Sequence, residues 1–250
     1  MSGHSKWASI KHKKGAADAK RGQLFTKLIK EITAAAKAGG GDPEANPRLR
    51  LAIAKAKEAN MPKDNIEKAV KRGTGELPGV IYEEVLYEGY APGGVAVLVE
   101  ALTDSKNRTT AEVRNLFNRN GGNLAGAGSV AWIFQKKGYI LVDKSKIEEE
   151  RLMDLVLNAG AEDLKAGDAA YEITTPSKDL EAVKQALAQA KIEPLSAELT
   201  MLPSSTVPVG DEQAAKKILA FMEQLEEHDD VSHAYANFDI PDEILAAAAK

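Results

Sequence analysis

Hydrophobic residues in the first third of the chain recur with the period of an α-helix. Between residues 18 and 37 they form a single stripe, made of Leu24, Phe25, Leu28, Ile29 and Ile32. The lysines of this segment, including Lys27 and Lys30, fall on the opposite face of the predicted helix. Three glycines at 39–41 end the helix, because glycine readily adopts the left-handed capping conformation.

Two further helices are predicted before residue 80. Asn46 followed by Pro47 is typical of an N-cap and a first helical position, and it opens the second helix. Asp64 with Glu67 three residues later resembles a capping box, so a short third helix follows and ends at Gly73. Residues 73–79 contain further glycine and a proline and indicate a linker.

After the linker the hydrophobic residues alternate with polar ones, as they do in β-strands. The predicted strands cover residues 81–90, 95–102, 130–134, 139–142, 169–174, 195–201 and 231–238, and the predicted helices cover 109–120, 147–159, 180–190 and 212–225. Thr109 with Glu112 is interpreted as a capping box that opens the first of these helices. Residues 246–249 are expected to fray.

The order of elements predicts an α+β fold with three domains. Residues 138–202 alternate strand, helix, strand, helix, strand, which suits a ferredoxin-like unit. The segment after residue 206 is too short for a core of its own, so we expect it to return to the sheet of residues 79–134. The predicted domains are a helical domain at 1–78, a discontinuous α/β domain at 79–134 and 206–244, and an inserted ferredoxin-like domain at 135–205.

Charge separates these domains more sharply than the net value of −4 suggests. Residues 1–80 carry 17 Lys and Arg and 8 Asp and Glu, whereas residues 81–250 carry 16 and 29. A head of net +9 therefore precedes a body of net −13. Such asymmetry indicates a polyanion, in particular nucleic acid, as the partner of the head. Like-charge repulsion turns the acidic body away from nucleic acid and leaves it free for protein partners.

The sequence carries no enzyme signature. Residues 126–131 (GAGSVA) formally fit a dinucleotide-binding fingerprint, but they follow a helix and precede a strand, which is the reverse of the required order. His228 and His233 stand near three acids, yet a spacing of five residues does not place two imidazoles on one helix face. We therefore expect a non-enzymatic protein without a catalytic residue, a cofactor or a metal ion.

Cellular location is constrained by three absences from the sequence. There is no cysteine, no secretory signal, and no apolar stretch of the roughly 18 residues that a membrane-spanning helix needs. These features suit a reducing compartment. We expect a cytoplasmic protein with no membrane partner.

The candidate nucleic-acid-binding residues lie mainly in the first 30 positions. Eight cations stand there against one acid: Lys6, Lys11, Lys13, Lys14, Lys20, Arg21, Lys27 and Lys30. Cations that are not interleaved with acids favour phosphate contacts over a salt-bridged surface, and binding should weaken steeply with salt. Trp7 lies among them and either stacks on a base or packs against the helical domain.

A second and weaker basic cluster surrounds the predicted helix after residue 105. Lys106 and Arg108 precede that helix, where backbone N–H groups also attract anions, and Arg114 and Arg119 follow on it. A mixed-charge surface is the slightly favoured interpretation of this cluster. Lys106 and Arg108 complete the set of candidate binding residues.

Long collinear motifs resemble the YebC/PmpR family across essentially the whole chain. The matching segments are GHSKW at 3–7, KHKK at 11–14, DAKRG at 18–22, NMPKDNI at 60–66, YEGY at 87–90, LTD at 102–104, NRT at 107–109, GGNL at 121–124 and GSVAW at 128–132. The mitochondrial translational activator of cytochrome oxidase subunit I is related to this family. The resemblance implies three domains, with one α/β domain inserted in the other, and a non-enzymatic cytoplasmic regulator of gene expression.

DNA and ribosomal RNA remain alternative targets. The resemblance favours a DNA-binding transcriptional regulator, although family members are also connected to translation at proline-rich stretches. The residues themselves show neither a polar base-reading helix nor the aromatic-rich sheet of RNA-recognition domains. We interpret the protein as a transcriptional regulator and keep a ribosome-associated, rRNA-binding translation factor as the alternative.

Overall fold

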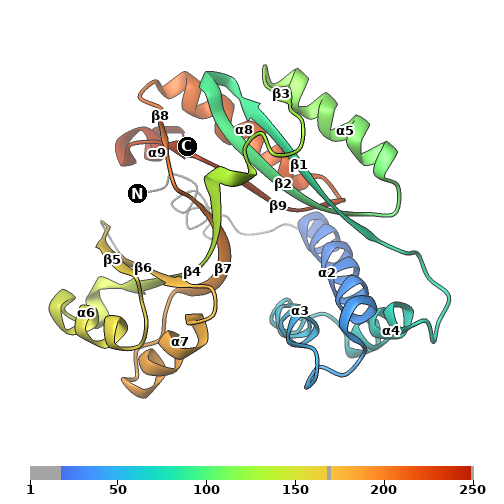
Figure 1. Ribbon diagram of the computed structural model, residues 1–250, viewed down its shortest axis with the longest axis horizontal. Coiled ribbons are helices and arrows are strands. Elements are labelled where there is room, and N and C mark those ends of the chain that lie inside the picture. The colour runs from blue at the N-terminus through green and yellow to red at the C-terminus, as the bar shows by residue number, and fades with distance from the viewer. Residues whose placement is uncertain (1–17, 168–169, 249–250) are drawn as a thin grey trace. The chain divides into compact units, whose positions relative to one another are not determined.

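A computed structural model describes residues 18–167 and 170–248, which form two compact units (Figure 1). Residues 132–206 form one unit, and the described residues on either side of them form the other. The fold is α+β with three domains, as predicted. They are a helical domain and two α/β domains, one of which is inserted in the other. Among the described residues, every helix is too short or too polar to span a bilayer.

The N-terminal domain consists of three helices, α2 (Asp18–Gly39), α3 (Pro47–Glu58) and α4 (Lys63–Thr74). Their apolar faces enclose a core that includes Ile32, Leu49 and Ile66. The predicted N-cap is confirmed, since the Asn46 side chain accepts a hydrogen bond from the Leu49 N–H at 3.1 Å. The predicted stripe on α2 is therefore a true core face.

Both predicted boundaries of α4 are wrong. The N-cap position is Pro62, and no side chain caps the helix there. Gly73 lies inside α4, where a Cβ atom would stand 2.4 Å from the carbonyl oxygen of Thr33 on α2. Glycine at 73 thus allows close helix packing, and Gly75, with φ of +84°, ends the helix instead.

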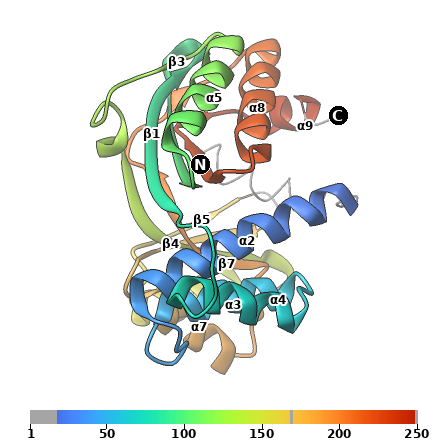
Figure 2. The same cartoon turned by 90° about the vertical axis from the view of Figure 1, so that its right-hand side faces the viewer.

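The discontinuous α/β domain is built on a four-stranded antiparallel sheet. The strands are β1 (Glu83–Ala91), β2 (Val95–Thr103), β3 (Asn123–Leu124) and β9 (Val231–Ala236), in the order β3-β1-β2-β9. Helices α5 (Lys106–Arg119) and α8 (Glu212–Glu227) lie side by side on one face (Figure 2). Because β9 pairs with β2, the chain returns to its first sheet after the inserted unit, as expected.

Three short elements complete this domain. Strands β8 (Val207–Pro208) and β10 (Phe238–Asp239) pair in parallel, and helix α9 (Asp242–Ala248) packs against α8. The expectation of a frayed end at 246–249 is wrong for residues 246–248, which belong to α9. The buried Leu245 anchors this helix in the main core of the domain.

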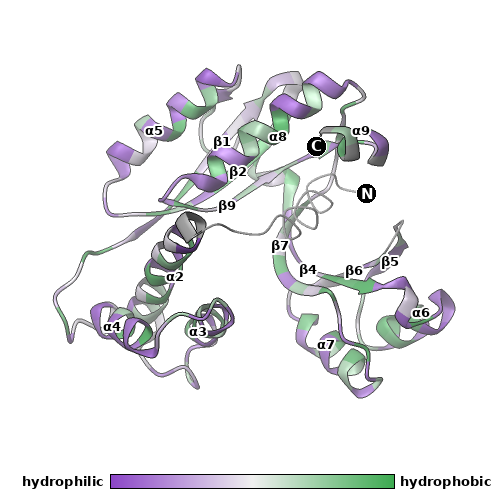
Figure 3. Cartoon of the chain, turned by 180° about the vertical axis from the view of Figure 1, so that it is seen from behind, coloured by the Kyte–Doolittle hydropathy of each residue, from purple (hydrophilic) through white to green (hydrophobic). Residues whose placement is uncertain are grey.

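The inserted unit has the ferredoxin-like arrangement. Its elements follow the order β4 (Phe134–Asp143), α6 (Glu149–Asn158), β5 (Asp163–Ala166), β6 (Ala170–Pro176), α7 (Leu180–Gln189) and β7 (Ser196–Pro203), and the sheet order is β5-β6-β4-β7. Both helices carry hydrophobic and hydrophilic residues (Figure 3), and their buried residues join those of β4 and β6 in one core. Strand β5 is absent from the sequence prediction because Leu164 is its only buried residue.

Two predictions near the boundary between the units differ from the structure. Residues 130–134 are not a strand, since residues 131–133 form a 3-10 turn and β4 begins only at Phe134. Helix α5 begins at Lys106 rather than at Thr109, so Thr109 is not its N-cap. Its hydroxyl instead donates to a buried carboxylate, which shows that a polar residue in a capping pattern can serve the tertiary structure.

Candidate nucleic-acid interface

The predicted binding residues are only partly within the described residues. Lys6, Trp7, Lys11, Lys13 and Lys14 lie outside them. Lys20 belongs to the first turn of α2, but its side chain is not described. Arg21 follows it and is exposed. The predicted role of the N-terminal arm therefore remains a prediction.

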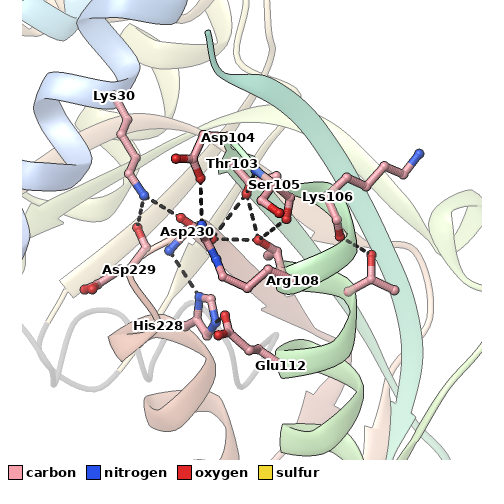
Figure 4. Close-up of polar contacts among 12 residues, drawn as sticks. Lys30, Thr103, Asp104, Ser105, Lys106, Arg108, Glu112, His228, Asp229 and Asp230 are labelled. Atoms are coloured by element: carbon pink, nitrogen blue, oxygen red, sulfur yellow. Dashed lines mark hydrogen bonds and ion pairs between the residues drawn. The ribbon is translucent and has the colours of Figure 1, made fainter. Parts of the chain in front are cut away.

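Lys27 and Lys30 differ from the prediction that they lie on an open face of α2. Lys30 is only 9% exposed, and its ammonium donates to Asp230 Oδ1 at 2.5 Å and to the Asp229 carbonyl oxygen at 3.0 Å (Figure 4). The Lys27 ammonium donates to the Glu226 carbonyl oxygen at the end of α8. The end of α8 and the residues that follow it cover this face of α2, so these two lysines hold the helical domain against the α/β domain.

Asp230 is the centre of this contact. It lies just before β9, is buried, and its Oδ2 atom accepts hydrogen bonds from Thr109 at 2.6 Å, Arg108 at 2.9 Å and Thr103 at 3.2 Å. Burial alone would raise the pKa of Asp230. The hydrogen bonds and charges that converge on the carboxylate outweigh it and hold the pKa well below its usual range. Asp230 is therefore ionised and connects α2, α5 and β2.

Arg108 and Lys106 stand on the first turn of α5 and face solvent to different degrees. Arg108 is half-exposed and uses Nη2 for both of its carboxylate contacts, with Asp104 at 2.7 Å and Asp230 at 2.9 Å. The hydrogen bonds that Arg108 donates to Asp230 and to Asp104 raise the pKa of its guanidinium further. The ammonium of Lys106, which is exposed, contacts no carboxylate among the described residues. These two residues stay accessible to a phosphate, unlike Lys30.

The surface near this network does not itself favour a polyanion. A groove of about 730 Å³ lies over it, between α2, α5 and α8. Its lining includes the carboxylates of Asp104, Glu112, Glu227, Asp229 and Asp230, against the cations of Lys30 and Arg108. Phosphate is therefore better accommodated by lysines outside the groove.

A further set of exposed cations lies on α3 and α4, and the candidate residues did not include it. Lys55 and Lys57 end α3, and Lys68, Lys71 and Arg72 share the outer face of α4. None of these five contacts an acidic side chain within the described part of the chain, whereas Arg48 pairs with Glu31 and Glu84. In the sequence, the excess of positive charge over residues 1–80 was the feature that pointed to these cations.

Glu112, His228 and Asp230 bring possible metal-ligand atoms within 4.8 Å of one another. Other groups already engage these atoms. His228 Nδ1 accepts the Asp230 N–H at 3.1 Å, and its Nε2 atom lies 3.0 Å from Glu112. Because Lys30 and Arg108 also neutralise Asp230, this cluster is an ion-pair network and not a suitable cation site.

Comparison with known proteins identifies the family. The family model for the TACO1/YebC N-terminal domain matches residues 5–76, and that for the second and third domains matches residues 82–238. A "probable transcriptional regulatory protein" of Desulfotalea psychrophila is 56% identical over 250 residues, covering 100% of both chains. One of Treponema pallidum is 59% identical over 245 residues, covering 98% of this chain and 100% of its own.

A solved structure agrees with these matches. The crystal structure of a conserved hypothetical protein from Aquifex aeolicus superposes with a TM-score of 0.83 at 51% identity, covering 96% of this chain and 99% of its own. The fold of this chain is thus shared with that solved structure over nearly its whole length. On the family models and the full-length identity, this protein belongs to the TACO1/YebC family.

Proposed function

We propose that the protein is a non-enzymatic, nucleic-acid-binding regulator of gene expression in the cytoplasm. The observation that carries this proposal is the set of exposed cations on α3 and α4 that have no acidic partner among the described residues. Phosphate is the partner that such a surface fits, since each contact releases condensed counterions. Arg108 and Lys106 on α5 are further accessible cations. The sequence before α2 adds Lys6, Lys11, Lys13 and Lys14.

DNA is the first candidate target, and the protein acts on it as a transcriptional regulator. The names of the relatives support this choice, because they describe probable transcriptional regulatory proteins. Residues 59–62 connect α3 and α4 closely enough for a helix-turn-helix arrangement. The exposed face of α4 then contacts the phosphate backbone.

Ribosomal RNA is the second candidate target, with a role in translation. The composition of α4 is compatible with it, because Lys68, Lys71 and Arg72 suit contacts with the phosphate backbone of RNA as well as of DNA. A protein that reads shape more than sequence matches structured RNA well. Relief of ribosomes slowed at proline-rich stretches is the corresponding activity.

A paired experiment separates these targets. The protein is titrated onto promoter DNA with and without excess nonspecific duplex, and it is sedimented with ribosomes across the same salt series. The DNA assignment would be overturned if excess nonspecific duplex abolished promoter binding while ribosome binding survived moderate salt. The ribosomal assignment would be overturned if the protein kept its binding to one promoter in excess duplex and did not sediment with ribosomes.

A triple variant tests the basic face itself. Replacing Lys68, Lys71 and Arg72 with alanine should weaken duplex binding and make the log–log salt slope shallower by about 2.7, at ~0.9 per lost phosphate contact. The matched control replaces three exposed lysines of the α/β domains, Lys146, Lys178 and Lys217, and removes the same charge. Equal slopes for the two variants would show that α4 does not contact phosphate.

A further inference from the structure

A pocket lies where the segment that connects α4 to β1 folds back on the helical domain. In this connecting segment, residues 75–82 (Figure 1), the Leu77 N–H donates to the Lys71 carbonyl oxygen at 3.1 Å. A Cβ atom at residue 79 would stand 3.0 Å from Cβ and Cγ of Arg72, so glycine there lets the segment pack directly on the Arg72 stem. The pocket holds about 360 Å³ and is lined by α2, the end of α4 and the connecting segment, all within one compact unit.

The connecting segment gives this pocket an apolar wall that is open to solvent. The wall consists of Leu77, Val80 and Ile81, which are 37%, 49% and 68% exposed. Ten large hydrophobic residues are exposed among those that the structure describes, and three of them gather in this wall. Clustered apolar side chains mark a binding surface more strongly than scattered ones do. The wall therefore suits a flat apolar group.

The charged side chains that line the pocket are cations. They are Lys37, in the last turn of α2, and Arg72 on α4, and the described lining contains no acid. Neither cation pairs with a carboxylate within residues 18–167 and 170–248. Glu76, the acid of the connecting segment, lies outside the lining and accepts a hydrogen bond from the Thr74 hydroxyl at 2.9 Å. The pocket thus fits a ligand with an anionic group beside a flat apolar one.

We propose that this pocket binds one unpaired nucleotide of the nucleic acid. The base lies against the apolar wall, and the phosphate lies on Lys37 and Arg72. The inference rests on the proposed nucleic-acid function and deepens it, since Arg72 also belongs to the basic face of α4. A strand whose phosphates follow that face brings a nucleotide to the pocket.

The size of the pocket and the cost of unpairing define the ligand further. Its volume is at the small end of the ~300–1,000 Å³ of ligand sites, which suits one base better than several. Taking a base out of a duplex requires unstacking and unpairing, whereas a bulged base is already free. Bulges, loops and single strands are therefore preferred to fully paired duplex.

The test compares three duplexes that differ at one position. The first is fully paired, the second carries one bulged nucleotide, and the third carries the same bulge with an abasic site in place of that nucleotide. The abasic bulge keeps the phosphate and removes the base. We expect the full chain to bind the bulged duplex about fivefold or more tightly than the abasic one at equal salt concentration. The comparison is made in DNA and in RNA, and the preference in either supports the proposal.

A double variant removes the apolar wall without changing the charge. Leu77→Ser with Val80→Ser should abolish the preference for the base and leave both the affinity for fully paired duplex and the salt slope unchanged. The matched control is Leu157→Ser with Leu199→Ser, in the inserted unit, where the two leucines are 46% and 38% exposed. Because all four side chains are exposed, both double variants should unfold at nearly the temperature of the parent.

A second variant tests the phosphate contact separately and keeps the proposal testable if the wall variant fails to fold. Lys37→Gln changes an exposed side chain outside the basic face of α4. It should weaken binding of the bulged and the abasic duplex alike, because both keep the phosphate, and make their log–log salt slope shallower by ~0.9. Binding of the fully paired duplex should change little. Equal weakening of all three duplexes would contradict the phosphate contact.

The remaining outcomes separate this proposal from the proposed function. Equal affinity of the parent for the bulged and the abasic duplex would overturn the pocket, while binding of the paired duplex would still support the proposed function. Failure of every duplex to bind at low salt would overturn both. A base preference that survived Leu77→Ser with Val80→Ser, or that the control variant lost equally, would also overturn the pocket.

Discussion

The substitution Asp230→Asn removes the one charge on which the cations of two domains converge. Lys30, 2.5 Å from Oδ1, would keep a buried ammonium with only the Asp229 carbonyl oxygen as acceptor. The new amide also places N–H donors against either Lys30 or the donors from Thr109 and Arg108. Breaking a buried pair at one partner costs ~3–5 kcal/mol, so we expect the free energy of unfolding to fall by about 3 kcal/mol at pH 7.

The pH dependence of that loss identifies its cause. The pKa of Asp230 is lowered on folding, so its carboxylate stabilises the folded protein above the unfolded pKa of about 3.9, and this contribution disappears as the pH falls toward the folded pKa. Urea unfolding of both proteins should therefore differ by a constant amount from pH 7 to about pH 5. Below about pH 4 the difference should shrink.

The control is the neighbouring residue. Asp229→Asn removes an equal charge from an exposed side chain and leaves its carbonyl contact with Lys30 intact, so it should change the unfolding free energy by under ~0.5 kcal/mol. A difference below ~1 kcal/mol for Asp230→Asn at pH 7, or one that persists unchanged to pH 2, would refute the ion-pair interpretation. Combining Asp230→Asn with Lys30→Met should cost less than the sum of the single changes, because each removes the same contact.

Two further predictions concern the helical domain. Gly73→Ala should destabilise the protein by ~1–3 kcal/mol, because the new methyl group meets the Thr33 carbonyl oxygen. Gly22→Ala, in open surroundings on α2, should instead stabilise it by up to ~1 kcal/mol. Melting temperatures of the two variants that shifted in the same direction would contradict this. Asn46→Ala should cost about 2 kcal/mol in urea unfolding, since it removes the α3 cap and two donors to carbonyl oxygens. Asn46→Asp keeps the acceptor and should recover part of the loss; recovery of all of it would show that the donors do not matter.

Local patterns predicted elements well where one period dominated. The alternation in residues 138–202 indicated the ferredoxin-like unit, since its strands bury every second residue and its helices one face. Strand β5 was missed because a single buried leucine leaves no period to detect. Residues 130–134 were predicted as a strand because a short apolar run has the same appearance in a buried strand and in a buried turn. Here it is a turn, whose backbone N–H groups donate to Glu88.

The candidate site was harder to predict for a different reason. Charge counts located the basic head, but they do not show which cations a second layer of structure covers. Lys30 looked solvent-facing because the α2 stripe lies opposite it, and only the return of the chain at residue 230 places a carboxylate against it. Lys68 and Lys71 remain exposed because no later segment of the described chain brings an acid to them. Long-range pairing thus decides which charges are available to a ligand.

The pairing of β9 with β2 has a consequence for synthesis of the chain. Strand β2 ends at Thr103 and its partner begins only at Val231, so the ribosome must add more than a hundred residues before that edge can close. At ~5–20 residues per second this takes roughly 6–25 s. The inserted unit, whose strands pair among themselves, can fold during that interval. Until then this edge of the apolar strand β2 stays unpaired, which leaves the nascent strand open to aggregation.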